Sequence, residues 1–232
     1  MQQTAGPTVQ FAVLVVLAVL VAFLVGRTLA SLDPFTIQHA TPVLSALDST
    51  PYRVHAGCEA SHPDPQQAAD MMAKLNQLMV DVQEHLRAKY VAHGSPFALP
   101  DPRYAARQRA VRLILRNYNQ DNLVENSHRD PEGDTSYSLD KGRVLAFCMR
   151  DKETGHLHRF HMLAFVALHE MAHLGTQEHG HPPVFWDTFC FILNEAHQAG
   201  IYTSPNFARH PERYCGMTVN YNPAWDPNAP SI

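Results

Sequence analysis

Residues 169–173 read His-Glu-Met-Ala-His, and this pattern strongly constrains how the chain folds around it. An α-helix turns by about 100° per residue, so residues four apart lie on one face, a turn apart. In a helix, His169 and His173 can therefore direct both imidazole rings toward a single metal ion. Glu170 lies beside them, where it can act on a water molecule at that ion. The pattern predicts a helix that carries a zinc site.

The residues around the pattern agree with this helix. Residues 159–174 contain no Pro or Gly, and Gly175 follows them as a natural helix end. Apolar residues recur at helical spacing along the segment. They are Phe160, Leu163, Ala164, Ala167, Met171 and Leu174. We therefore expect the two histidines in the second half of a half-buried helix.

Two histidines compete for the third ligand position. His181 stands directly before a second predicted helix, residues 182–200, whose two leading prolines suit a first helical turn. Phe185 in that turn can anchor the segment in the core and so fix His181. His179 lies in the connecting loop, where less holds it in place. The residues favour His181 and leave His179 as the alternative ligand.

Three neutral imidazoles can hold Zn²⁺ and leave one coordination position for water. Glu170 is then the expected general base for hydrolysis. A hydrolytic site also needs a hydrogen-bond donor for the oxyanion of the transition state. Tyr202 and Tyr214 follow the second predicted helix and are the candidates, although each could instead pack in the core.

The run HEMAHLGTQEHGHPPVFW resembles the WLM and SprT-like zinc peptidases, whose pattern is HExxH, a short loop and HxxxF. The WLM-like proteins of large DNA viruses and algae are most similar. Three further runs extend the resemblance over roughly residues 100–217: SYSLDKG at 136–142, CMRD at 148–151 and YCG at 214–216.

This resemblance implies an α+β, zincin-like minimal metallopeptidase domain with a small antiparallel sheet beside the zinc helix. It also implies zinc ligands at His169, His173 and His181, a base at Glu170, and a preference for Tyr214 over Tyr202 as the oxyanion donor. The loop before the third histidine is longer than in many WLM members, which keeps His179 open as a ligand.

Periodicity predicts two more helices, at residues 64–93 and 101–118, and strands within residues 137–149. By analogy with zinc peptidases, the strand at 144–150 is expected to be the edge strand that pairs with an extended substrate. His156, His158 and His161 cluster at the start of the predicted zinc helix. Because no carboxylate or cysteine completes a second metal site there, we interpret them as surface histidines.

Residues 11–25 are fifteen consecutive apolar residues. They predict a single-pass membrane anchor, because no Lys or Arg precedes them as a signal peptide would require. A cleaved signal peptide, and hence secretion, remains the alternative. Arg27 on the C-terminal side favours a cytosolic catalytic domain. The expected organisation is an anchor at 1–27, a tether at 28–62, the zinc domain at 63–221 and a disordered tail at 222–232.

The formal net charge of −4 argues against a nucleic acid partner. Five arginines between residues 103 and 116 recur along one predicted helix and are interpreted as a solvated face. The four cysteines, at positions 58, 148, 190 and 215, could form two disulfides or remain thiols. Cys190 fits a core thiol, and Cys215 is not expected to bind zinc.

The sequence thus predicts a membrane-anchored zinc metallopeptidase that acts on protein or peptide substrates. The resemblance raises the alternative of a WLM-type peptidase acting on DNA–protein crosslinks. A second alternative is a catalytically silent zinc-binding protein with a structural role, for example in a virion membrane. Glu170 argues against this second alternative, because a purely structural zinc site has no use for a general base.

Overall fold

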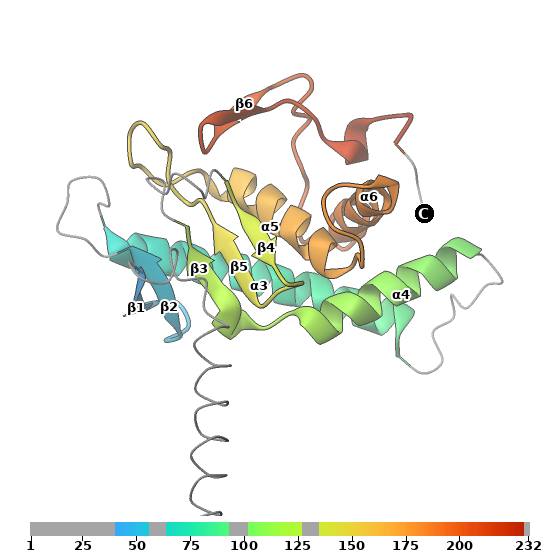
Figure 1. The fold of residues 1–232 in the computed structure, drawn as a ribbon, viewed down its shortest axis with the longest axis horizontal. Helices are drawn as coiled ribbons and strands as arrows, with labels where there is room; N and C mark the ends of the chain where they lie inside the picture. The colour runs from blue at the N-terminus through green and yellow to red at the C-terminus, as the bar shows by residue number, and fades with distance from the viewer. Residues whose placement is uncertain (1–39, 56–63, 93–101, 127–134, 230–232) are drawn as a thin grey trace, which may run out of the picture. The chain divides into compact units, whose positions relative to one another are not determined.

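Helices and one small sheet make up most of residues 40–55, 64–92, 102–126 and 135–229, the part of the chain that the computed structural model describes (Figure 1). The four helices of this part are α3 (Pro65–Tyr90), α4 (Pro102–Asn117), α5 (Phe160–Leu174) and α6 (Pro183–Gln198). Each coincides with a predicted helix to within a few residues. The α+β class is confirmed.

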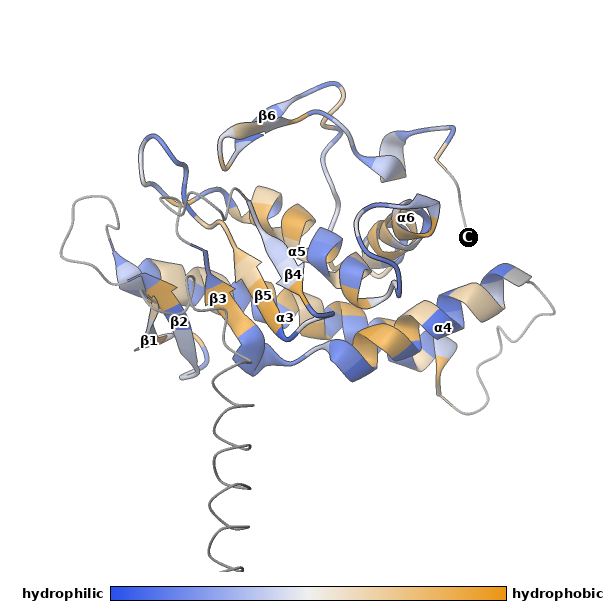
Figure 2. Ribbon diagram, in the orientation of Figure 1, coloured by the Kyte–Doolittle hydropathy of each residue, from blue (hydrophilic) through white to orange (hydrophobic). Residues whose placement is uncertain are grey.

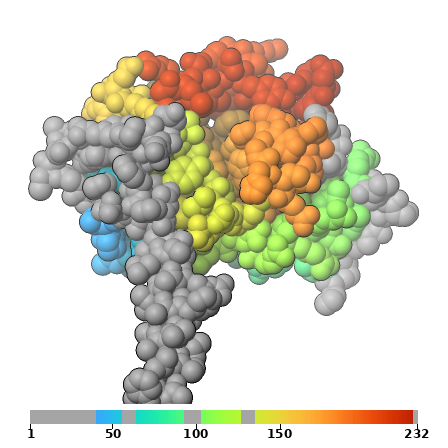
Figure 3. All heavy atoms as spheres, viewed as in Figure 1, coloured from blue at the N-terminus to red at the C-terminus, as the bar shows by residue number. Residues whose placement is uncertain are grey.

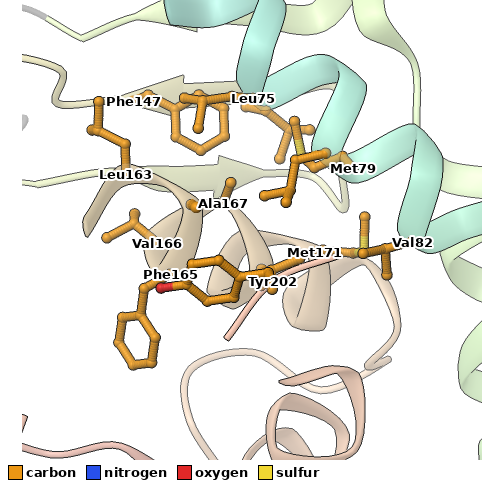
Figure 4. Close-up of a cluster of buried hydrophobic side chains, with 14 of the residues drawn as sticks. Leu75, Met79, Val82, Phe147, Leu163, Phe165, Val166, Ala167, Met171 and Tyr202 are labelled. Atoms are coloured by element: carbon orange, nitrogen blue, oxygen red, sulfur yellow. The ribbon is translucent and has the colours of Figure 1, made fainter. Parts of the chain in front are cut away.

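Two features of its sequence explain why α3 forms: a capping residue at its N-terminus and apolar residues that recur at helical spacing. The Asp64 side chain accepts a hydrogen bond from the Gln67 backbone N–H (3.0 Å), and Pro65 occupies the first turn. Its apolar stripe packs against α5, where Leu75, Met79 and Val82 lie near Phe147 and Met171 (Figure 4). This packing fixes the helix that carries the histidines.

A five-stranded sheet lies against these helices in the order β1-β2-β3-β5-β4. The strands are β1 (Ala40–Leu44), β2 (Pro51–His55), β3 (Leu123–Glu125), β4 (Tyr137–Leu139) and β5 (Val144–Phe147). Alternate residues of β5 pack on opposite faces: Leu145 and Phe147 join the main core, while Val144 and Ala146 form a smaller cluster with Val124. Figure 2 shows this apolar character along β3 and β5.

The prediction of an antiparallel sheet is wrong, because the sheet is mixed. Strand β3 runs parallel to both of its neighbours, β2 and β5, whereas β1–β2 and β4–β5 are antiparallel. The chain passes through α3 and α4 between β2 and β3, and such a long crossover permits parallel pairing. After β3 the chain forms β4 at the edge of the sheet. It then turns back into β5, which lies between β3 and β4 and runs parallel to β3.

The prediction that residues 144–150 form the sheet edge is also wrong. Strand β5 pairs with β3 on one side and with β4 on the other, and its four residues are all buried. In the described residues, β4 pairs with β5 alone and its three residues are half-buried. The edge strand is therefore β4, one strand earlier in the chain.

Two predicted irregular segments are ordered parts of the fold. Residues 40–55, predicted within a tether, form β1 and β2, and Tyr52 and Val54 of β2 enter the core. Residues 222–229, predicted as a disordered tail, contain a short 3-10 helix, η2 (Pro223–Trp225). There the Asn222 side chain donates to Ser204 Oγ (2.9 Å), and the Trp225 indole donates to the Ser204 carbonyl (2.9 Å). The domain thus extends beyond the predicted limits 63–221.

The prediction of a single-pass membrane protein is corrected. None of the helices that the structure describes is both long enough and apolar enough to cross a bilayer. The longest, α3, is amphipathic and carries charged residues such as Lys74 and Glu84. The segment predicted as an anchor or signal peptide, residues 11–25, lies outside the described residues. We propose no membrane location for this chain.

Helix α5 ends at a crowded junction of three helices. A Cβ added to Gly175 would lie 3.1 Å from side-chain atoms of Ile114 in α4 and of Thr188 in α6. The Asn117 side chain also donates to the Leu174 carbonyl (3.0 Å), which satisfies a free carbonyl at the helix end. Glycine therefore permits the close approach of α4 and α6 just after the second histidine of the motif.

Candidate metal centre and cleft

Three histidines converge at the end of α5 and the start of α6. The ring nitrogens of His169, His173 and His181 all lie within 4.8 Å of one another, and the Nε2 atoms of His169 and His181 are 3.0 Å apart. A tetrahedral zinc ion with bonds of about 2.0–2.1 Å holds its nitrogen ligands about 3.4 Å apart. The three side chains are thus close enough to one another for a single metal ion to contact all three. His179 is exposed in the loop and does not belong to this cluster.

Phe185 holds the three imidazoles together. Its side chain is fully buried in the first turns of α6. Its ring centroid lies 4.8 Å from that of His169, 4.3 Å from that of His173 and 4.5 Å from that of His181. Because the packing of α6 fixes this ring, it also fixes the position of His181, which is otherwise exposed. The relation between Phe185 and His181 was the basis for favouring His181 from the sequence.

The surroundings of these histidines favour the neutral form of their imidazoles. Burial holds the pKa of His169 well below its ordinary value, and the neighbouring His173 and His181 lower it further. Burial, together with His181 and Lys141, lowers the pKa of His173 to about 4, and burial also lowers the pKa of His181. A neutral imidazole has a free nitrogen lone pair, which is the form that binds a metal ion.

Glu170 is buried beside the three histidines and forms no ion pair with the residues that the structure describes. Its side chain is 2% exposed, and its Oε2 atom has no hydrogen-bond partner among the described residues. Burial raises the pKa of this carboxyl to about 8. An isolated buried carboxyl destabilises a fold, and such groups occur mainly where function requires them.

Tyr214 lies at the same cleft, on the strand β6 (Glu212–Tyr214). Its hydroxyl is hydrogen-bonded to the Ser136 hydroxyl, whose oxygen also accepts the Cys148 backbone N–H (2.9 Å). If Ser136 donates its proton to Tyr214, the Tyr214 hydroxyl retains its own proton for a third group. Burial raises the pKa of Tyr214, and the nearby Glu170 also raises it, so the phenol remains a donor.

Tyr202, the other candidate donor, packs in the hydrophobic core. Its ring packs beside Phe165 and Met171 (Figure 4), and its hydroxyl donates to the His161 backbone carbonyl in the first turn of α5 (2.6 Å). This hydrogen bond satisfies a backbone group, and Tyr202 does not line the cleft.

The strand β6 pairs with β7 (Met217–Val219) in a hairpin that forms one wall of the cleft. A disulfide joins Cys215 in the hairpin turn to Cys148 at the end of β5. The sequence left open whether the cysteines pair; Cys190 is a buried free thiol, and Cys58 lies outside the described residues. Figure 3 shows this C-terminal segment, in red, directly against the orange atoms of the helical layer.

Two histidines at the start of α5, His158 just before it and His161 in its first turn, help to hold this hairpin. The ring Nε2 of His158 accepts the Cys215 backbone N–H (3.2 Å), and His161 Nε2 lies 2.8 Å from a Glu212 carboxylate oxygen. Both histidines are half-buried, and their partners come from a hairpin more than fifty residues later, so they have a structural role that their interpretation as surface histidines did not include. Among the described residues, the histidines at 156, 158 and 161 form no metal-binding group.

The disulfide should contribute strongly to stability. It closes a loop between residues 67 apart in the sequence, and loop-closure entropy then predicts a stabilisation of about 4 kcal/mol. Replacing both Cys148 and Cys215 by Ala should lower the free energy of unfolding in urea by about this amount. A reducing agent should have the same effect on the wild-type protein and none on the double variant. Identical unfolding curves with and without reductant for the wild type would contradict this assignment.

Two side chains of the site had no predicted role. Ser136 and Lys141 lie in the SYSLDKG run, which is notable in the sequence only for its resemblance to a family pattern. Lys141 Nζ donates to the backbone carbonyl of Glu178, in the loop that leads to His181. Lysine and serine are too common on protein surfaces for sequence alone to reveal such contacts.

Two proteins of known sequence are similar to part of this chain. An uncharacterised protein of Acanthamoeba polyphaga mimivirus is 33% identical over 99 residues, 42% of this chain and 49% of that protein. An uncharacterised protein of Invertebrate iridescent virus 6 is 34% identical over 73 residues, 31% of this chain and 40% of that protein. The matches thus span about half the length of these relatives or less.

No family model matches the chain, and no solved structure matches it. The names of the two viral relatives give no activity. The resemblance to WLM and SprT-like peptidases therefore stays a prediction.

Proposed function

We propose that this chain is a zinc-dependent peptidase of WLM or SprT-like type, with a zincin-like catalytic domain. His169, His173 and His181 would hold the metal, and Glu170 would transfer the proton in hydrolysis. The observation that carries the proposal is the buried Glu170 carboxyl, with an unpartnered oxygen, beside three converging imidazoles. A structural metal site would have no need of this carboxyl.

The donor set suits zinc among the common metals. Three neutral imidazoles are borderline-soft nitrogen ligands, which zinc accepts, whereas calcium and magnesium require oxygen ligands. No cysteine or carboxylate of the described residues joins the group of three histidines. Three protein ligands also leave a fourth position open, as in catalytic rather than structural zinc sites.

A zinc ion held by these histidines would supply Lewis-acid polarisation of a substrate carbonyl and would make a water molecule more acidic. Glu170 then accepts a proton from the attacking water as the new C–O bond forms. It returns that proton to the amide nitrogen as the C–N bond breaks, so that one water is consumed and two peptides are released. Tyr214 donates a hydrogen bond to the oxygen that becomes negatively charged in the transition state.

The substrate backbone would lie along β4, the edge strand beside the cleft. Ser136, Tyr137 and Ser138 line the cleft from this strand and the residue before it. An extended peptide can add to an exposed sheet edge through backbone hydrogen bonds, which depend little on the peptide sequence. In this proposal β4, rather than residues 144–150, is the edge strand that pairs with the substrate.

Activity on DNA–protein crosslinks has less support. The exposed arginines on α4, which include Arg109, Arg112 and Arg116, do not line the cleft. The net charge of −4 gives no overall attraction to nucleic acid.

The other alternative is a catalytically silent zinc protein, and an experiment must distinguish it from a peptidase. Cleavage of an unfolded protein by the zinc-loaded enzyme should require both the metal and Glu170, whereas a silent protein would cleave nothing.

Tyr214→Phe should lower kcat by about 10²–10³-fold, the usual effect of removing one oxyanion donor, with little change in KM. The matched control is Tyr202→Phe, which removes a hydroxyl that bonds to a core carbonyl. That variant should lose about 1 kcal/mol of stability and keep its kcat. Steady-state kinetics and thermal unfolding of both variants measure the difference. A Tyr214→Phe enzyme with wild-type kcat would remove Tyr214 from the mechanism.

A further inference from the structure

The cleft continues past the histidines into an apolar recess. The whole cleft, with the histidines and the recess together, has a volume of about 430 Å³, within the range of small-ligand sites. Next to the proposed reacting groups, the recess is lined by aromatic and aliphatic side chains from α5, α6 and the strand β7. They are Phe165, Val166, Trp186, Phe189 and Val219. This lining has no role in the proposed proton transfer.

Charged side chains are few in the described lining of the cleft. Apart from Glu170 and the three histidines, the described side chains that line it include no Asp, Glu, Lys, Arg or further His. A charged substrate side chain would therefore lose its water without gaining a partner, which is costly. A bulky apolar side chain would gain contact with the aromatic rings and would leave water.

The recess also lies directly beside the proposed reacting groups. Val166 precedes His169 by three residues, Glu170 by four and His173 by seven, so all four share one face of α5. Its side chain is 8% exposed and faces the same cleft. A substrate side chain that contacts Val166 must therefore belong to a residue next to the bond being cleaved.

We infer that the cleft selects an extended peptide segment with a bulky apolar residue, such as Phe or Leu, adjacent to the scissile bond. This inference rests on the proposed function, since it places a substrate beside the proposed zinc site. Strand β4 holds the peptide backbone, and the recess between α5, α6 and β7 accepts the apolar side chain.

Peptides that differ at one position test the inference. That position, next to the scissile bond, carries Phe, Leu, Ala, Asp or Lys in an otherwise constant sequence. The zinc-loaded wild type should cleave the Phe peptide at least about tenfold more efficiently than the Ala peptide, because even one methylene in an apolar pocket gives about 10–200-fold discrimination. The Asp and Lys peptides should be the poorest substrates.

The same peptides also test binding without cleavage. Zinc-loaded Glu170→Gln protein, titrated with each peptide by calorimetry, should bind the Phe peptide at least about tenfold more tightly than the Ala peptide. If this preference holds but the wild type cleaves nothing, the proposed function fails and the apolar recess stands. If the wild type cleaves all five peptides equally, or the Glu170→Gln protein binds none or all alike, the inference is wrong.

Two substitutions of one valine link the preference to the recess. Val166→Phe fills the recess and should reduce the preference for Phe over Ala by at least about tenfold. Val166→Ala enlarges the recess and should shift the substrate preference toward a peptide with Trp at the tested position. This second variant keeps the test decisive if the Val166→Phe protein does not fold. Val43→Phe is the matched control, because Val43 is a half-buried valine of β1 that does not line the cleft. A Val166→Phe enzyme with unchanged specificity would overturn the assignment.

Discussion

Replacing Glu170 by Gln should lower peptide hydrolysis by about 10²–10⁴-fold, the usual contribution of a general acid–base group. Glutamine keeps the size of the side chain but cannot accept the proton of the attacking water. The zinc content should not change, because Glu170 is not among the three converging histidines that we propose as ligands. Hydrolysis of a fluorogenic peptide library and metal analysis of the same protein samples measure both quantities.

The stability of the Glu170→Gln variant is the control for this experiment. Glu170 is buried and its Oε2 atom lacks a partner in the described residues, so a neutral amide of the same size should not lower the unfolding temperature. A variant that is folded, zinc-loaded and inactive supports the general-base role. A variant that is equally loaded and as active as the wild type would exclude it.

Replacing His181 by Ala should weaken zinc binding by more than about 100-fold. Loss of a hydrogen-bond partner behind a metal ligand already costs about 10–100-fold, and loss of the ligand itself should cost more. His179→Ala is the matched control, since His179 is an exposed histidine in the same loop and lies outside the cluster. It should keep both zinc affinity and activity. Zinc competition with a chromophoric chelator provides the affinities.

The reverse pattern, in which His179→Ala loses zinc and His181→Ala keeps it, would contradict the ligand set. Equal losses in both variants would mean that the loop, rather than one ring, determines binding. Phe185→Leu separates these cases further. It removes a ring that lies within 4.8 Å of all three imidazole centroids while keeping an apolar side chain. We expect it to weaken zinc binding less than His181→Ala does.

The helices and the cluster of ring nitrogens were predictable because both depend on residues close together in sequence. A 3.6-residue period marks α5, and the i, i+4 spacing of His169 and His173 places both rings on one face. His181 also lies near in sequence, and Phe185 one turn later indicated how it would be held. The structure brings these residues together as the pattern predicts.

The mixed sheet and the hairpin could not be predicted in the same way, because they depend on contacts between distant residues. Strand β4 has only three residues, and its edge position follows from the parallel pairing of β3 with β5. Cys148 could have paired with any of three other cysteines. The roles of His158 and His161 depend on a hairpin more than fifty residues away. No local pattern encodes such partners.

Hydrolysis in water labelled with oxygen-18 tests the central claim most directly. The zinc-loaded protein is incubated with an unfolded protein, and mass spectrometry then identifies new peptide ends. We predict new carboxyl termini that each carry one labelled oxygen, formed by the wild type and absent with Glu170→Gln or with a zinc chelator. If the zinc-loaded wild type forms no new termini, or if Glu170→Gln forms as many, the chain is not the zinc peptidase proposed here.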